Sequence, residues 1–320
     1  MTLRTHGRYG FQAVGGLVEP AAANHWVPAH GIPMAMEYAF GSLRAADGTY
    51  WWGVRGSYRD RARFLHLGES DPGQDFRFLV DAEGYMGSVI HEERDGWWGV
   101  WLPDGSSLIA TDGPIIRWTE PDILDVEGEL IGDAIQLFAP DAQEPLVYTS
   151  RPFRVSGTVR GTPVTGLLFH DSMHMPDGQN FITSSYVSAL EAAWVAFATE
   201  FEDGTIQSGH LVWGTQDFAI LIVQRSDGPS IVLRDLSVEV TFDGAEPEFP
   251  RAVRFTGGGE TWLWEAFSAG GRLPVRKDLP DQHRWTQGWV HREGETRRPV
   301  STEAMMETYN DRLADVRMGA

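Results

Sequence analysis

The chain contains no cysteine, and this absence excludes several classes of chemistry. Among its 320 residues there is no Cys, so disulfides, thiolate nucleophiles, iron–sulfur clusters and zinc–thiolate sites are ruled out. A cysteine-free chain fits the cytoplasm. The N-terminal run MTLRTHGRYGFQAVGG has no apolar core followed by a cleavage site, so we expect no signal peptide. No stretch reaches the roughly 20 apolar residues of a membrane helix. The sequence therefore predicts a cytoplasmic protein without a membrane span.

Basic residues are also scarce. The chain has 26 Lys and Arg against 45 Asp and Glu, which gives a formal net charge of −19. Phosphate binding relies on clustered Lys and Arg, so we expect no nucleic acid partner, and an anionic membrane surface is disfavoured for the same reason. Hydrophobic residues make up 42% and charged residues 22%, which is typical of a globular protein.

Several familiar motifs are missing. No GxGxxG follows a strand and opens a helix, and there is no GxxxxGK phosphate loop, no GxSxG elbow and no HExxH. The GGGE at 257–260 lies between strand-like segments, where a hairpin or bulge explains it better. An ordinary serine hydrolase and a nucleotide-binding fold are therefore not expected.

Turn pairs and short aromatic segments are abundant instead. Asp-Gly pairs, among them Asp47-Gly48 and Asp203-Gly204, supply the positive φ angles of tight hairpins. They separate segments such as YWWGVRGSY, HLVWG and FAILIVQ, which are rich in aromatic and β-branched residues. This spacing predicts a mostly antiparallel β protein. Residues 187–196 (VSALEAAWVA) fit a short helix or a strand entry, and the tail from Ser301 is the best helix candidate because of its strong helix formers.

The number of strands exceeds one small barrel. A division near residue 155 gives an N-terminal domain of residues 1–155 and a C-terminal domain of residues 156–320 that carries the terminal helix. The fold class we predict is all-β, with two antiparallel barrels or sandwiches side by side. One large closed sheet is the alternative. Both a monomer and a homodimer are compatible with the sequence.

Tryptophan is frequent, with 13 residues. Trp262 and Trp264 are two apart, so on a strand they share one face with Glu260, and Glu265 points the other way. Core packing is one interpretation, because each ring buries about 150–250 Å². The other is an aromatic-lined ligand cavity, in which Glu260 would act as an acid with a raised pKa unless it is an exposed hairpin-end residue. The candidate substrate-binding tryptophans are Trp194, Trp213, Trp262 and Trp264.

The run LFHDSMHM concentrates polar groups in a strand-like segment. If the strand continues, His170, Ser172 and His174 share one face and Asp171 and Met173 the other. If the chain turns at Asp171, the two histidines approach each other. A metal site would need a third ligand from elsewhere. An acid–base pair is possible because a carboxylate and imidazoles can relay protons. Histidines with satisfied hydrogen bonds at a strand end are the third interpretation.

The glutamates of the run HEERDG suggest a weaker alternative. His91, Glu92 and Glu93 precede a turn and fit a solvated strand end. A carboxylate pair for glycoside hydrolysis in a Trp-rich β protein is the competing interpretation. It predicts a carbohydrate-active protein or lectin in which exposed tryptophans stack on sugar rings.

The longer run FRVSGTVRGTPVTGLLFHDSMHM resembles a core motif of the superfamily of carotenoid hydratases, tocopherol cyclases and lipocalin-like Diels–Alderases (tandem lipocalin-like, AttH-like proteins). The family's glycine spacing is kept at Gly157, Gly161 and Gly166. Phe169-x-Asp171 matches its aromatic-x-Asp step, whereas Ser172 and His174 stand where the family has histidine and tryptophan. The resemblance implies two tandem lipocalin-like barrels, no organic cofactor, and a hydrophobic small-molecule substrate such as a terpenoid.

These observations lead to one hypothesis and two alternatives. We expect a cofactor-independent lyase of the hydratase or dehydratase type, or an isomerase or cyclase. In this hypothesis Asp171 and His174 transfer protons with help from His170, and Phe169 and Ser172 contact the substrate. The alternatives are a non-catalytic lipid- or terpenoid-binding protein and a carbohydrate-active β protein. No metal site is predicted.

Overall fold

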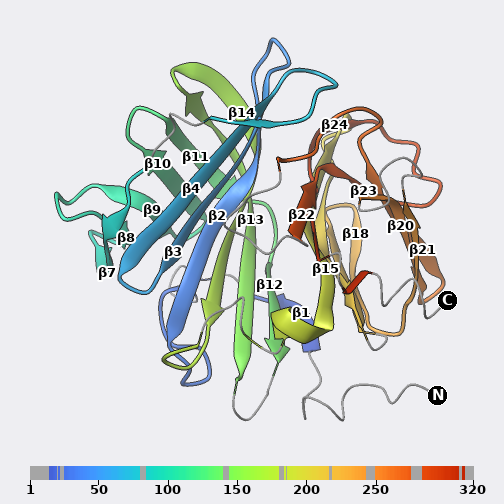
Figure 1. The fold of residues 1–320 in the computed structure, drawn as a ribbon, viewed down its shortest axis with the longest axis horizontal. Coiled ribbons are helices and arrows are strands. Elements are labelled where there is room, and N and C mark those ends of the chain that lie inside the picture. The colour runs from blue at the N-terminus through green and yellow to red at the C-terminus, as the bar shows by residue number, and fades with distance from the viewer. Residues whose placement is uncertain are drawn as a thin grey trace.

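The computed structural model describes residues 14–19, 21, 25–79, 84–139, 144–179, 184, 186–215, 218–242, 249–274, 283–309 and 312–313. Within them the chain is almost entirely antiparallel β-structure (Figure 1). The all-β fold class is confirmed. No helix among the described residues is long and apolar enough to cross a membrane.

The first sheet contains 14 strands in the order β5-β4-β3-β2-β14-β13-β11-β10-β9-β8-β7, with β12 beside β13, β1 beside β12 and β6 beside β4. Its strands are β1 (Val14–Val18), β2 (Met34–Arg44), β3 (Tyr50–Tyr58), β4 (Arg61–Ser70), β5 (Arg77–Phe78), β6 (Gly87–Ser88), β7 (Ile90–Arg94), β8 (Trp97–Trp101), β9 (Ser107–Asp112), β10 (Ile115–Glu120), β11 (Leu124–Leu130), β12 (Ala134–Ala139), β13 (Leu146–Val159) and β14 (Thr162–His174).

The remaining strands form two smaller sheets. A seven-stranded sheet has the order β18-β17-β16-β15-β25-β22 with β24 beside β15, and a four-stranded sheet has the order β19-β20-β21-β23. Their elements are η3 (Tyr186–Leu190, a π-helical turn), β15 (Glu191–Phe201), β16 (Ile206–Gly214), β17 (Ala219–Arg225), β18 (Gly228–Leu233), β19 (Ser237–Phe242), β20 (Pro250–Gly257), β21 (Glu260–Ala266), β22 (His283–Thr286), β23 (Gly288–Arg292), β24 (Pro299–Glu303) and β25 (Met306–Tyr309).

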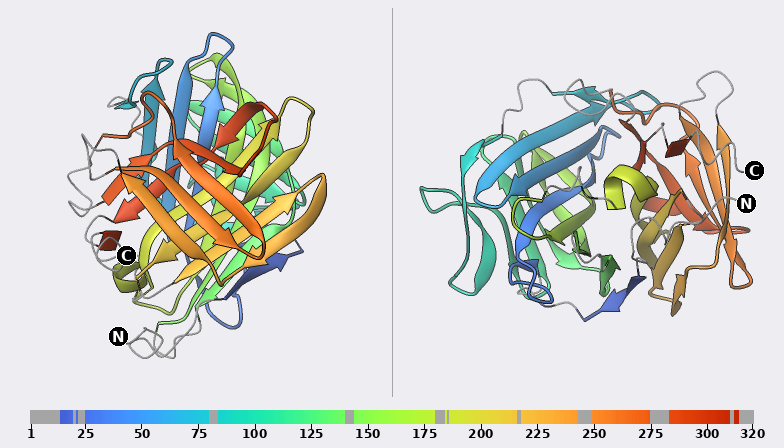
Figure 2. Two further views of the ribbon diagram at one scale, coloured as in Figure 1. Left: turned by 90° about the vertical axis from the view of Figure 1, so that its right-hand side faces the viewer. Right: turned by 60° about the horizontal axis from the view of Figure 1, so that its bottom comes forward.

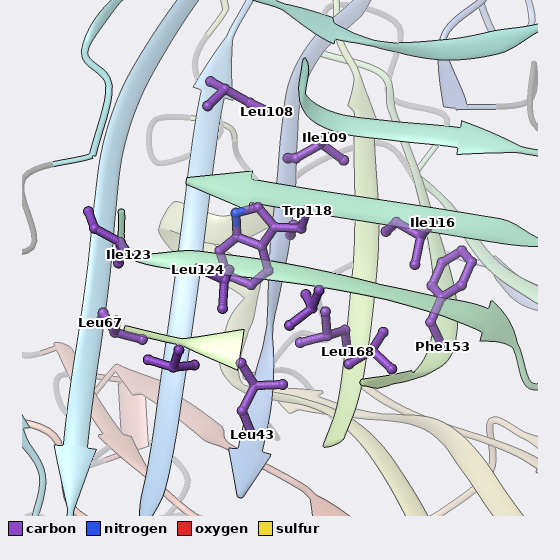
Figure 3. Packing of buried hydrophobic residues seen from close by; sticks show 14 of the residues in the cluster. Leu43, Leu67, Leu108, Ile109, Ile116, Trp118, Ile123, Leu124, Phe153 and Leu168 are labelled. Carbon is purple, nitrogen blue, oxygen red and sulfur yellow. The ribbon is translucent and has the colours of Figure 1, made fainter. Parts of the chain in front are cut away.

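Each half of the molecule has its own apolar core. The first sheet curls around a cluster that includes Leu43, Trp118, Phe153 and Leu168, whose side chains converge between its strands (Figure 3). The right-hand view of Figure 2 shows this curled sheet on one side and the two smaller sheets on the other. A second core lies between the smaller sheets. Further apolar residues of β2, β13 and β14 pack against β15, β16 and β17 and join the two halves.

The prediction of a helix from Ser301 is wrong for the described residues of this segment. β24 and β25 occupy most of residues 299–309, and both pair with β15. Backbone hydrogen bonds to the edge of β15 and burial of the side chains outweigh the helix propensity of Glu, Ala and Met in this segment. Only residues 312–313 are helical, and residues 310–311 and 314–320 lie outside the described residues. For residues 187–196 the structure gives the π-helical turn η3 followed by a strand, so the strand-entry interpretation holds.

The predicted boundary at residue 155 falls inside β13. Both β13 and β14 belong to the first sheet, and the second sheet begins with β15 at Glu191. We therefore propose that the chain divides after His174.

Candidate active site

Strand β14 continues unbroken through the HDSMH run, so its side chains alternate between two environments. Asp171 faces Ser150 and Tyr38 across the neighbouring strands, on the side of the sheet that packs against β15 and β16. Ser172 faces Glu37 on the opposite side, in the interior of the curled first sheet. The first of the two geometries considered for this run is therefore the one present. It separates Asp171 from His170 and His174.

Asp171 lies in a buried layer between the two halves of the molecule. Its exposed fraction is 2%. Its Oδ2 accepts a hydrogen bond of 2.5 Å from the Tyr148 hydroxyl of β13. Its Oδ1 has no partner among the residues that the structure describes. Phe169 lies two residues earlier on the same face and stacks on Phe40, with ring centroids 5.5 Å apart. The carboxyl group thus has one free oxygen in aromatic surroundings.

Aromatic rings from the second sheet complete this layer. Trp194 of β15 stands edge-on to Tyr148 at 6.0 Å and to Phe40 at 5.6 Å. His210 of β16 lies 5.4 Å from Tyr148 and 5.3 Å from Trp194. Neither nitrogen of His210 has a hydrogen-bond partner among the described residues. An unpaired buried polar group is costly, so the position of His210 against the Tyr148 ring, whose hydroxyl bonds to Asp171, is a functional signal.

Two buried carboxyl groups of this layer have pKa values that are shifted in opposite directions. Burial raises the pKa of Asp171 to about 7, although the nearby Ser150 and Tyr148 hydroxyl groups oppose the shift. Burial also acts on Glu307 of β25, but its ion pair with His283 overcomes burial and lowers the pKa of Glu307. Both carboxyl groups lie near the Tyr38 hydroxyl and, after burial, raise its pKa. Asp171 is thus suited to hold a proton near neutral pH, while Glu307 stays ionised.

His170, Ser172 and His174 occupy the other side of β14. All three are fully buried in the first sheet's interior. His170 Nε2 lies 3.4 Å from Glu37 Oε2, and the His174 ring contacts the Val27 carbonyl oxygen at 2.8 Å. His91, expected at a solvated strand end, also points inward, 3.8 Å from Glu37. No group of three His, Asp or Glu side chains in the described part of the chain is arranged to hold a metal ion.

The other predicted substrate-binding residues lie away from Asp171. Trp213, Trp262 and Trp264 are 0–1% exposed in the core between the two smaller sheets, as core packing predicts. Glu260 accepts a hydrogen bond of 3.0 Å from the Trp262 indole. Only Trp194 and Phe169 of the predicted set share the Asp171 layer.

Sequence reasoning missed several members of this layer. Tyr148 and Tyr38 lie on strands that the alternation of apolar and polar residues predicts. Their positions beside Asp171, however, depend on the order of the strands in the sheet. His210 sits in the segment SGHLVWG, where its position facing away from Trp213 follows from alternation alone. Glu307 fell within the tail assigned as a helix. A strand reading of that tail would have placed Glu307 on the face of Trp194, its partner in the β15–β25 pairing.

Comparisons with known proteins support the fold. No family model matches the sequence, and no curated protein matches it. Among solved structures, a protein provisionally named AttH from Nitrosomonas europaea is similar at 18% identity and a TM-score of 0.52, over 92% of this chain and 97% of that one. Kievitone hydratase from Nectria haematococca is similar at 9% identity and 0.50, over 92% and 93%. CghA gives 9% identity and 0.41, over 92% and 94%. The chain thus shares the fold of the AttH-named protein and of kievitone hydratase.

Proposed function

We propose that this protein is a cofactor-independent enzyme that protonates a hydrophobic small molecule in the layer between its two halves. The observation that carries this proposal is the Asp171 carboxyl group, buried with one free oxygen among aromatic rings. With a pKa of about 7 it is about half protonated at neutral pH and largely protonated at pH 6. A neutral carboxylic acid in an apolar site can protonate an alkene or an ether oxygen.

The surrounding groups fit the charge that such a step creates. Protonation of an alkene leaves a carbocation, which the faces of Trp194, Tyr148 and Phe169 would stabilise. The ionised Glu307, held by His283, would attract the same positive charge and can accept a proton when the cation is resolved. Loss of a different proton from this cation gives isomerisation, and attack by a second double bond of the substrate followed by loss of a proton gives cyclisation. Attack by water followed by loss of a proton gives hydration, and the reverse sequence, which starts with protonation of a hydroxyl group and loss of water, gives dehydration. The reaction class is therefore a hydratase-type lyase or a cyclase. The hydratase with which the chain shares its fold supports the first.

The test exchanges the carboxyl group for an amide. The protein is incubated in D₂O with a panel of hydrophobic alkenes that includes kievitone, and products are examined by mass spectrometry for the addition of water or of solvent deuterium. Asp171→Asn is expected to lower turnover by about 10²–10⁴-fold, the usual contribution of a general acid. Asp177→Asn, an exposed aspartate just beyond β14, is the matched control and should keep full turnover.

Binding is measured separately, by quenching of tryptophan fluorescence. Full turnover by Asp171→Asn would contradict the acid role. Saturable binding by the native protein with no turnover of any panel member would instead favour the non-catalytic lipid- or terpenoid-binding alternative.

A further inference from the structure

The interior of the first sheet holds a buried arginine for which the described residues provide no counterion. Arg151 of β13 is 0% exposed and lies beside His170 in the β13–β14 pairing. Its Nη2 donates a hydrogen bond of 2.6 Å to the Gly113 carbonyl oxygen. Its Nε and Nη1 have no partner among the described residues. The centre of the Phe153 ring lies 5.3 Å from its Cζ atom. A guanidinium group is charged at any physiological pH, so this is an uncompensated buried charge.

Arg55 in the same sheet shows what the normal arrangement looks like. It is equally buried, and both its Nε and its Nη2 bind the carboxylate of Glu120, the first at 2.5 Å. Its Nη1 donates to the Tyr85 carbonyl oxygen at 3.0 Å. Every nitrogen of Arg55 is therefore satisfied, and its charge is neutralised. Arg151 and Arg55 lie in the same curled sheet and are equally buried, so the difference between them is in their immediate hydrogen-bond and charge partners.

Polar atoms on the interior face of β14, and those of His25 stacked on it, are also unpaired. Both nitrogens of His25, Nδ1 of His170 and Oγ of Ser172 lack partners among the described residues. The His25 and His170 rings stack with centroids 4.6 Å apart. His25 is close enough to Arg151 that their electrostatic interaction, after burial, lowers the pKa of His25. Hydrogen-bond donors thus gather around a positive charge.

The acid nearest this cluster does not neutralise it. Glu37 contacts His170 at 3.4 Å and accepts a hydrogen bond of 2.5 Å from Ser57. Burial raises the pKa of Glu37 to about 8, so its carboxyl group is mostly protonated at neutral pH. Burial lowers the pKa of His170 to about 3, which leaves that ring neutral. The cluster therefore carries the positive charge of Arg151.

We propose that the interior of the first sheet is a second ligand site, which binds a small oxyanion through Arg151 with His25, His170 and Ser172 as further hydrogen-bond partners. It is distinct from the Asp171 layer because it lies on the opposite face of β14. The apolar cluster around Trp118 fills the neighbouring interior (Figure 3), which restricts the ligand to a small one. The Trp26 ring packs against the His170 ring, with ring centroids 5.1 Å apart, and borders this part of the interior.

The test measures binding of acetate, benzoate and inorganic phosphate to the full chain by isothermal titration calorimetry. Saturable binding of at least one of them is expected, and the three ligands tell a carboxylate site from a phosphate site. Arg151→Met should weaken that binding by more than about tenfold, since it removes the charge. Arg154→Met is the matched control: Arg154 lies on the same strand, is about half exposed and pairs with Glu200. It should leave the affinity unchanged.

The stability of the ligand-free protein gives an independent readout. A residue kept for binding is retained at a cost to stability, so Arg151→Met should raise the melting temperature without added anion. If the variant does not fold, Ser172→Ala and His25→Gln serve for the binding comparison and should each weaken affinity. The proposal is overturned if none of the three anions binds the native protein, or if Arg151→Met binds as tightly as the native chain.

Discussion

Asp171 and Trp264 illustrate how two buried side chains of similar exposure differ in role. One oxygen of Asp171 is unpaired among the described residues, whereas the Trp264 indole donates a hydrogen bond of 3.0 Å to the Ala304 carbonyl oxygen. A residue with every polar atom satisfied in a closed core contributes to stability. A residue with a free polar atom beside another unpaired group is a candidate for binding or catalysis.

This contrast gives a prediction for two tryptophans. Trp264→Phe is expected to lower the free energy of unfolding by about 2–3 kcal/mol, because it leaves a small cavity and an unpaired carbonyl group. It should not change ligand affinity per folded molecule. Trp194→Phe should weaken the binding of a hydrophobic ligand instead, since Trp194 borders the Asp171 layer. Urea unfolding and fluorescence titration measure the two effects. A loss of affinity in Trp264→Phe with none in Trp194→Phe would reverse the assignment.

At the same scale, the sequence identified Asp171 and Trp194 but not their partners. Alternation along a strand is a local property, and it correctly separated Asp171 from His170 and His174 once the strand was known to continue. The contacts of Asp171 with Tyr148, and of its layer with His210, join residues 23 or more positions apart. Such contacts depend on the order of strands in the sheet, which no local pattern encodes.

At the scale of the element, two glycines of the run that forms β13 and β14 have different structural roles. Gly161 adopts φ of 77° in the turn between β13 and β14, a conformation that suits glycine. Gly166 has a different role. A Cβ atom there would lie 1.9 Å from the Ser42 backbone oxygen of β2. Strand β2 can approach β14 this closely only because residue 166 has no side chain.

Gly166→Ala is therefore expected to force β2 and β14 apart and to lower the free energy of unfolding by about 3 kcal/mol, as overpacking of a close contact does. Gly16→Ala in β1 is the control, because a Cβ atom there has nothing within 4 Å. It should be neutral or slightly stabilising. The midpoints of urea unfolding compare the two variants. Equal midpoints would show that the β2–β14 contact yields without cost.

The C-terminal elements show where element prediction from sequence fails. The segment STEAMMETY contains strong helix formers, yet it provides the end of β24 and all of β25. Its Thr302, Glu303, Met306 and Thr308 side chains are buried against the sheets. Propensity describes an isolated segment, whereas this one completes the edges of a sheet and buries its apolar side chains. The strand-rich remainder was predictable because Asp-Gly turns and aromatic alternation are local signals.

At the scale of the whole molecule, the two halves are joined by polar groups as well as by apolar ones. Ser42 of β2 contacts Glu303 of β24, and the Trp52 indole of β3 donates to the same carboxyl group at 3.3 Å. Gln287 donates to the Tyr50 hydroxyl at 2.8 Å. The composition predicted two β units, but which residues would join them could not be derived from the sequence.

Several buried carboxyl groups give the whole molecule a characteristic pH dependence. Burial raises the pKa of Asp171 and Glu303 to about 7, and that of Glu37 and Glu191 to about 8. The folded state therefore retains protons that the unfolded chain releases above about pH 4–5. Each retained proton makes stability fall by about 1.4 kcal/mol per pH unit until the folded pKa is passed.

Buried histidines act in the opposite direction at lower pH. Burial lowers the pKa of His170 and His210 to about 3 and also lowers that of His25, so the unfolded chain binds more protons than the folded protein below about pH 6.5. This contribution makes stability rise with pH up to about 6.5 and roughly offsets the carboxyl groups there. Above pH 6.5 only the carboxyl groups still contribute.

We therefore expect stability to be greatest near pH 6 and to decrease between about pH 6.5 and 8, because the folded state still retains carboxyl protons, those of Glu37 and Glu191 longest, that the unfolded chain has already released. Urea unfolding at pH 6, 7 and 8 in a constant ionic strength buffer measures this directly. Asp171→Asn should reduce the decrease between pH 6 and 7, since an amide retains no titratable proton and the folded pKa of Asp171 is about 7, and Asp177→Asn should leave it unchanged. A midpoint that is constant or rises from pH 6 to 8 would mean that these carboxyl groups ionise in the folded protein without penalty. Such a result would also remove the electrostatic basis for Asp171 as a proton donor.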